Sequence, residues 1–102
     1  MKIFWTINLL STLVFSKEYH CSEHSFYLLQ TEYGYEHVNH KIFLNSSTLV
    51  SEFSDNNWFI ENISCTKRGF KIIGSHRQYN DLTNKIFLLI PINKTTYTLH
   101  KI

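Results

Sequence analysis

Two cysteines, Cys21 and Cys65, are the residues of this chain whose type most directly indicates chemistry. In an oxidising compartment they can pair within the chain in only one way. The loop that this bond would close is long enough to stabilise the fold by about 4 kcal/mol in the chain-entropy model. Two buried free thiols, or a bridge between two chains, are the alternatives.

Three asparagines lie in Asn-X-Ser/Thr sequons, namely Asn45, Asn62 and Asn93. Such a sequon is an acceptor for N-glycosylation in a secreted chain. Asn45 and Asn93 lie in turn-like stretches, which favours their use. Asn62 lies inside an expected strand, so its use requires that its side chain face solvent. The chain is rich in Asn, Ser and Thr, and one or two matches are therefore expected by chance.

Six histidines raise the question of a metal site. His37 and His40 have an H-x-x-H spacing, and His20 and His24 lie elsewhere. A zinc site needs three or four ligands, and both cysteines are expected in the disulfide. We therefore expect surface histidines, no metal and no cofactor.

Catalytic motifs give no better indication. The sequence contains no G-x-S-x-G, H-E-x-x-H or P-loop pattern. Ser, His and Asp are abundant, but no spacing among them marks a triad. We expect a protein that is not an enzyme.

Two groups of residues are candidates for contacting a partner. Lys67 and Arg68 form a basic turn that an acidic partner would fit, and a solvated hairpin turn is the alternative. Exposed aromatic side chains are the stronger indication, since Tyr and Trp are enriched at binding hot spots. Tyr33, Tyr35 and Trp58 are the aromatic candidates, although Trp58 also suits a core position.

The elements that position these residues are expected to be strands. The chain has no alanine and many β-branched and aromatic residues, which favours strands over helices. Apolar and alternating stretches at spacings of roughly 8–12 residues are typical of a small sandwich. About seven strands are expected, at or near 25–30, 41–44, 48–53, 58–65, 70–73, 84–92 and 95–99.

Residues 58–65 and 70–73 are expected to form the central hairpin. Period-two alternation assigns the side chains of the first strand to two faces. The core face receives Phe59, Ile63 and Cys65, and the outer face receives Trp58, Ile60, Asn62 and Ser64. Glu61 is the exception to the core-face pattern.

The N-terminus indicates the compartment. Lys2, an apolar run and then the small residue Ser16 predict a secretory signal peptide over residues 1–16. A membrane anchor is the alternative, but the run is short and interrupted by polar residues, whereas a span needs about 20 mostly apolar residues. Residues 17–102 would then form one domain in the endoplasmic reticulum lumen or outside the cell. A formal net charge of +2 for the whole chain gives no indication of nucleic-acid binding.

Several short segments together resemble a known family. The hydrophobic leader is followed by Glu18-Tyr19-His20-Cys21, by Phe26-Tyr27-Leu28-Leu29, by Ile63-Ser64-Cys65-Thr66 and by Ser75-His76-Arg77-Gln78-Tyr79. This pattern resembles the coronavirus accessory proteins with an immunoglobulin-like domain, the products of the 7a and 8 reading frames. The resemblance spans most of the expected mature chain and depends on spacing and scattered identities.

The resemblance implies a compact immunoglobulin-like sandwich in which Cys21 and Cys65 form a cross-sheet disulfide. Two departures matter. The 7a type has a second disulfide, and the matching regions here hold Tyr33/Tyr35 and Ile72/Ile73. The 7a type also has a C-terminal membrane span, which this sequence does not show. The resemblance therefore implies a soluble version closer to the 8 type, with no membrane span after removal of the signal peptide.

These observations together predict a secreted viral accessory glycoprotein that modulates host immune defence by binding a host protein. One alternative is a small secreted host or parasite binding protein of a salivary or cytokine-like kind. Another is a lipid-carrying β-fold. A pocket lined by Phe26, Phe43, Phe59 and Phe87 would favour the carrier, and a filled core would exclude it.

Overall fold

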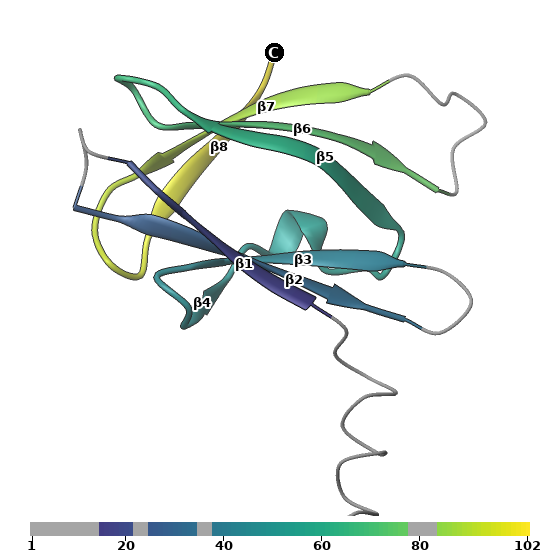
Figure 1. Ribbon diagram of the computed structural model, residues 1–102. Helices are drawn as coiled ribbons and strands as arrows, with labels where there is room; N and C mark the ends of the chain where they lie inside the picture. Colours follow the sequence, from purple (N-terminus) through teal and green to yellow (C-terminus); the bar gives the residue numbers. More distant parts are fainter. Residues whose placement is uncertain (1–14, 22–24, 35–37, 78–83) are drawn as a thin grey trace, which may run out of the picture.

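The computed structural model describes residues 15–21, 25–34, 38–77 and 84–102, which form two antiparallel sheets packed face to face (Figure 1). The first sheet contains β1 (Phe15–His20), β2 (Tyr27–Tyr33), β3 (Asn39–Leu44) and β4 (Thr48–Leu49), and the second contains β5 (Trp58–Cys65), β6 (Phe70–His76), β7 (Lys85–Pro91) and β8 (Tyr97–Lys101). The expected all-β sandwich with one disulfide is confirmed.

The strands follow each other in chain order within each sheet, as β1-β2-β3-β4 and β5-β6-β7-β8. Each sheet is therefore a meander, and the chain finishes the first sheet before it starts the second. Immunoglobulin domains connect their two sheets by Greek-key crossings instead. This chain has the layered architecture of such a sandwich with a simpler connectivity.

Two segments differ from the expected strands. The polar residues after the predicted signal peptide belong to β1, an edge strand that pairs with β2 from Phe15↔Glu32 to His20↔Tyr27. Of the predicted signal peptide, only Phe15 and Ser16 lie within the described residues. The expected strand at 48–53 ends after β4, and Ser51–Phe53 forms the 3₁₀ helix η1.

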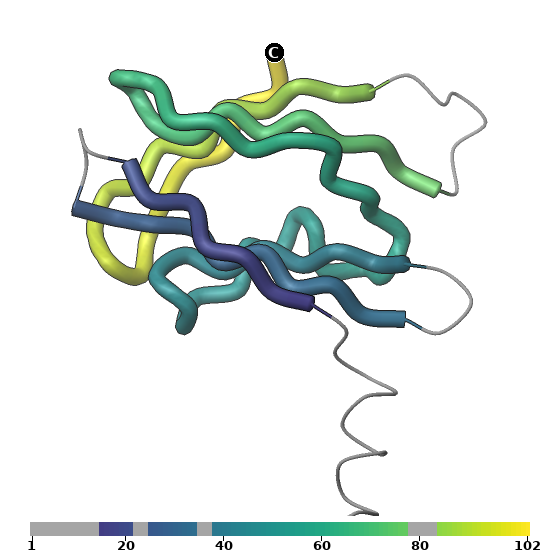
Figure 2. Tube along the Cα trace, viewed as in Figure 1, coloured from purple at the N-terminus to yellow at the C-terminus, as the bar shows by residue number. Residues whose placement is uncertain are grey.

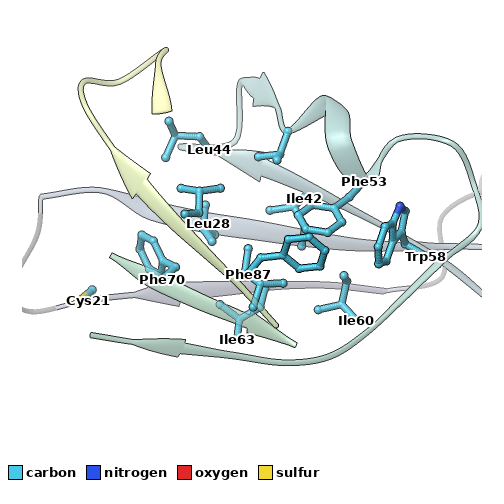
Figure 3. Packing of buried hydrophobic residues seen from close by; sticks show 13 residues of the cluster. Cys21, Leu28, Ile42, Leu44, Phe53, Trp58, Ile60, Ile63, Phe70 and Phe87 are labelled. Atoms are coloured by element: carbon cyan, nitrogen blue, oxygen red, sulfur yellow. The ribbon is translucent and has the colours of Figure 1, made fainter. Parts of the chain in front are cut away.

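An aromatic cluster fills the core between the sheets (Figure 3). Phe53 of η1 is fully buried, and its ring meets Trp58 at 5.0 Å and Phe87 at 5.2 Å between centroids. Trp58 and Phe87 are 5.7 Å apart, and all three contacts are edge-to-face. This geometry favours aromatic pairs beyond the area that they bury. Phe53 thus links the connection between the sheets to the core.

A β-bulge in β5 changes the expected faces of this strand. The pairing with β6 shifts between Ile60 and Asn62, so Glu61 is an extra residue. An extra residue moves every later side chain to the other face. The predicted assignment is therefore right for Ile63 and wrong before the bulge, where Trp58 and Ile60 are buried and Phe59 is 43% exposed. Cys65, also predicted to face the core, is exposed at the end of the strand. The alternative core position of Trp58 is the one observed.

The Cys21–Cys65 disulfide connects the end of β1 to the end of β5, and so joins the two sheets. Its Cα atoms are 5.4 Å apart. The β5–β6 and β7–β8 turns lie at this same end of the sandwich, on the left in Figure 2. We call it the disulfide end.

Two side-chain hydrogen bonds add to the disulfide in tying the second sheet to the rest of the chain. The Asn45 Nδ2 group donates to the backbone oxygen of Lys94 in the β7–β8 turn at 3.3 Å. The Tyr97 hydroxyl of β8 donates to Oε1 of Glu52 in η1 at 2.6 Å. The second bond holds the last strand of the chain against the connection between the sheets.

Replacing both cysteines by serine should lower the free energy of unfolding by about 4 kcal/mol, because the disulfide closes a loop with a sequence separation of 44 residues. Small domains are stable by roughly 5–15 kcal/mol in total, so the variant should lose much of its stability. Urea denaturation of residues 17–102, followed by Trp58 fluorescence, measures the change. Thr98→Ser, at an exposed position of β8, is the matched control. A loss below about 1 kcal/mol for the double serine variant would contradict this role.

Burial, and then the hydrogen bond from Tyr97 to Glu52, raise the pKa of Tyr97 above its usual value. The folded state therefore holds this proton to a higher pH than the unfolded state does. The protonated Tyr97 hydroxyl therefore contributes fully to the stability of the fold below about pH 10, and this contribution is lost as the pH rises through the raised pKa. Absorbance titration at alkaline pH, with Tyr97→Phe to assign the signal, should show that Glu52→Gln moves the Tyr97 transition to lower pH. An unchanged transition would show that the Glu52 carboxylate has no part in the shift.

Candidate functional site

His40 of β3 is the first side chain to test for chemistry, because it is buried at 3% exposure beside a carboxylate. The backbone N–H of Ile60 donates to its Nδ1 at 2.7 Å. An N–H group can only donate, so Nδ1 carries no proton and Nε2–H faces Oε2 of Glu32 at 3.2 Å. Nδ1 therefore joins β3 to β5, and Nε2 bonds to the paired strand β2 of the same sheet. His40 acts as a link between the sheets.

His76 of β6 is also buried and lies at the same end of the sandwich as His40. Its Nε2 is 2.7 Å from Oδ2 of Asp55, and its ring meets Trp58 edge-on at 5.0 Å. Within the described ranges, no group of three or more His, Cys, Asp or Glu side chains could hold a metal ion, and no pocket is found. His24 and His37, from the sequence-based metal question, lie outside those ranges.

The basic turn is exposed, as expected, at the disulfide end. Lys67 and Arg68 are its exposed residues. The turn is closed by Thr66, whose N–H donates to the Gly69 oxygen at 2.8 Å and whose Oγ1 accepts from the Gly69 N–H at 3.1 Å. A Cβ at Gly69 would lie 2.2 Å from the Leu89 backbone oxygen, so the turn needs glycine there.

Arg77 follows β6 at the opposite end from this turn. Its guanidinium donates to Oδ1 of Asn39 at 2.6 Å and to the Val38 backbone oxygen at 2.5 Å. The intervening seven-residue strand spans about 23 Å. Lys67, Arg68 and Arg77 therefore do not form one basic patch, and Arg77 ties β6 to the start of β3.

Of the three aromatic interface candidates, Tyr33 lies on a surface. Trp58 is buried at 8% exposure, and Tyr35 lies outside the described residues. Tyr33 ends β2, and Nζ of Lys41 lies 5.5 Å from its ring centroid, within cation–π range. This contact places both side chains on the face of the first sheet that points away from the core.

Apolar side chains gather on that outer face of the first sheet. Alternation and register place Tyr27, Leu29, Tyr33, Phe43 and Leu49 there. Leu29, Phe43 and Leu49 are paired neighbours in one row across β2, β3 and β4. Leu49 is 39% exposed, and the other four are half-buried. An antiparallel sheet with one solvated face usually has polar residues there, so this apolar face needs an explanation.

The outer face of the second sheet also carries a group of apolar side chains, and these are aliphatic. Four of its residues form what we call the aliphatic stripe, namely Ile73, Ile86, Leu88 and Ile90. Leu88 is only 8% exposed, although it lies outside the core cluster. Lys71 and His100 are its paired neighbours on the two adjacent strands.

The three sequons lie at different places. Asn62 is exposed on the outer face of β5. Asn93 is exposed in the β7–β8 turn, where its Oδ1 accepts from the Thr95 N–H at 2.9 Å. Asn45 is half-buried in the β3–β4 turn, with φ of 53°, and its Oδ1 accepts from the Tyr27 N–H at 3.1 Å. The Asn45 amide nitrogen points to Lys94, so no sequon projects over the outer face of the first sheet.

Sequence reasoning found Tyr33 but not the surface around it. The sequence feature that could have indicated this surface is the presence of consecutive apolar residues in β2 and β3, namely Leu28-Leu29 and Ile42-Phe43-Leu44. Adjacent residues of a strand face opposite sides, so each run puts apolar side chains on both faces.

Comparison of the chain with family models, with curated proteins and with solved structures finds no match. In the part of the chain that the structure describes, no helix has the length and apolar character needed to cross a membrane.

His40→Leu should destabilise the fold by about 1–3 kcal/mol, because the Ile60 N–H would be buried without an acceptor. His100→Leu changes an exposed histidine and is the matched control, with an expected effect below about 0.5 kcal/mol. Urea denaturation of both variants provides the comparison. Equal stability of His40→Leu and the natural chain would refute the proposed link.

Proposed function

We propose that this chain is a secreted glycoprotein that acts by binding another protein through the outer face of the first sheet. The observation that carries the proposal is the gathering of Tyr27, Leu29, Tyr33, Phe43 and Leu49 on that face. Contiguous exposed apolar surface is a mark of protein–protein interaction sites.

The arrangement of this face matches the anatomy of an interface. Its centre is the row of Leu29, Phe43 and Leu49, and charged side chains lie around it. Glu18 of β1 is the paired neighbour of Leu29 on the other side of the row. An apolar centre with a polar rim is typical of protein interfaces.

The two tyrosines of the face are held in place by their neighbours. His20 stacks on Tyr27 at 4.7 Å between ring centroids, and Lys41 lies over Tyr33. The Tyr27 hydroxyl is 2.8 Å from Oγ of Ser46. Side chains that are already ordered lose less conformational entropy on binding. Both tyrosines are thus suited to anchor a partner.

Secretion is supported by three features of the chain. A disulfide is typical of oxidising compartments, residues 1–16 have the pattern of a signal peptide, and three sequons are present. Two of these sequons, Asn62 and Asn93, have exposed side chains, as glycosylation requires.

The resemblance to coronavirus accessory proteins extends the proposal to a source and a partner class. The chain would be a viral accessory glycoprotein, and its partner a host secretory-pathway or cell-surface protein of immune defence. The leader pattern, the disulfide, the sequons and the strand spacing support this extension. The sequential strand order speaks against a close match, because the immunoglobulin fold is a Greek key.

The alternatives differ in what they require. A secreted host or parasite binding protein would use the same face, and only its source would differ. A lipid carrier would need the four phenylalanines named above around one pocket. Phe43 and Phe59 lie on the outer faces of opposite sheets, and Phe87 fills the core. These side chains therefore do not line a common pocket.

Leu49→Lys and Tyr33→Ser should each weaken partner binding by at least tenfold, since both remove apolar contact area from the proposed surface. The partner is sought by screening the glycosylated protein against an array of host cell-surface and secretory ectodomains. Biolayer interferometry then measures Kd for each variant.

Thr98→Lys, on the exposed outer face of β8, is the matched control and should change Kd by less than twofold. Urea denaturation checks that each variant is folded. The proposal fails if folded Leu49→Lys and Tyr33→Ser bind as tightly as the natural chain, or if no ectodomain binds.

A further inference from the structure

The aliphatic stripe on the second sheet has no role in the proposed binding face. It includes the outward side chains of β7, whose residues Ile86–Ile90 form an uninterrupted apolar run. Phe87 and Leu89 of this run point into the core, and Ile86, Leu88 and Ile90 point outward. Such runs are typical of strands that are covered on both faces. The outer face of the second sheet is therefore expected to have a cover.

The bulge in β5 aims Asn62 at this stripe. Before the bulge, Trp58 and Ile60 face the core, and simple alternation would turn residue 62 inward as well. The extra residue Glu61 turns Asn62 outward and Ile63 inward. Bulges commonly re-aim a side chain in this way. The sequon is thus presented to solvent by a specific irregularity of the strand.

The register then brings Asn62 next to the stripe. Asn62 pairs with Ile73, and Ile73 pairs with Ile86, so the three side chains form one row on the outer face. Neighbouring strands lie about 4.8 Å apart, which puts Ile86 about 10 Å from Asn62 across the sheet. Among the described residues β5 is an edge strand, and no strand of that part of the chain pairs with it on the other side of Asn62.

We propose that an N-glycan on Asn62 lies across the aliphatic stripe and shields it from other chains. This inference depends on the secretion part of the proposed function and not on the binding face. The oligosaccharide comes from a lipid-linked diphosphate donor. The bond between Asn62 Nδ2 and sugar C1 forms, the C1–O bond to the diphosphate breaks, the diphosphate takes the electron pair, and the amide proton leaves to a base.

The chemistry of the first sugar suits this cover. N-acetylglucosamine has an apolar face of C–H groups and an acetyl methyl group, which can pack on Ile73 and Ile86. Its hydroxyl groups face water, so a glycan converts an aliphatic surface into a polar one. A glycan on edge strand β5 also obstructs pairing with the edge of another sheet, which exposed edges otherwise invite.

The other two sequons are not placed to do this. Asn93 lies in the β7–β8 turn at the disulfide end, and the Asn45 amide donates to Lys94 in that same turn. A glycan on either would project from the end of the sandwich. The shielding role is therefore specific to Asn62 and can be separated from glycosylation in general.

The first test is site occupancy in protein secreted from animal cells. Enzymatic release of N-glycans converts each occupied Asn to Asp, and peptide mass mapping then identifies the sites. Asn62 should be occupied in most of the secreted protein. Secreted protein with unmodified Asn62 would overturn the proposal, as would a stable dimer formed through the stripe.

The second test removes the glycan. Ser64→Ala abolishes this sequon and keeps Asn62, and Thr95→Ala abolishes the Asn93 sequon as the matched control. Ser64→Ala should increase the fluorescence of a bound apolar dye several-fold and cause self-association in sedimentation, and Thr95→Ala should do neither. Adding Ile86→Thr to Ser64→Ala should reverse much of the effect.

Release of glycans from already folded natural protein provides the same comparison if Ser64→Ala is not secreted. An equal response of the two sequon variants, or no response to glycan removal, refutes the shielding role. Binding of the partner by Ser64→Ala should stay within twofold of the natural chain, because the binding face lies on the other sheet. Failure of the shielding role thus leaves the proposed function standing, and loss of binding in Leu49→Lys does not bear on the glycan.

Discussion

The Cys21–Cys65 bond joins two sheets that share no strand, and the rest of the structure depends on that junction. Each sheet is a meander of consecutive strands, so backbone pairing alone would leave two separate four-stranded units. The disulfide acts at one end of the sandwich, and the His40–Ile60 hydrogen bond acts toward the other. Between them, the ring cluster of Phe53, Trp58 and Phe87 packs the two sheets together.

One extra residue in β5 determines which side chains of this strand face the core and which face solvent. Without the bulge at Glu61, the strand could not bury both Trp58 and Ile63, since they lie five residues apart and would face opposite sides. The same shift turns Asn62 to the outside. The bulge therefore allows both apolar side chains to be buried and also exposes the sequon. This is a physical reason for an irregularity in an otherwise regular hairpin.

The outer face of each sheet carries a group of apolar side chains, and the two groups differ in kind. The outer face of β2–β4 contains tyrosines with polar hydroxyl groups and a charged rim, which suits a partner that binds reversibly. The face on β6–β7 is an aliphatic stripe beside a sequon on β5, which suits a permanent cover. Our two proposals follow from this difference: a protein partner for the first face and a glycan for the second.

The sequence by itself determined the β class, the sequons and the approximate positions of most strands, because these depend on composition and on local patterns. It also determined the disulfide pairing, because Cys21 and Cys65 can pair within the chain in only one way. The tertiary structure decided the rest. It placed Trp58 in the core, bonded Arg77 to the start of β3, and put Tyr33 on a larger apolar surface. Register, bulges and the neighbours across a sheet arise from contacts between residues far apart in the chain, and a local pattern carries no record of them.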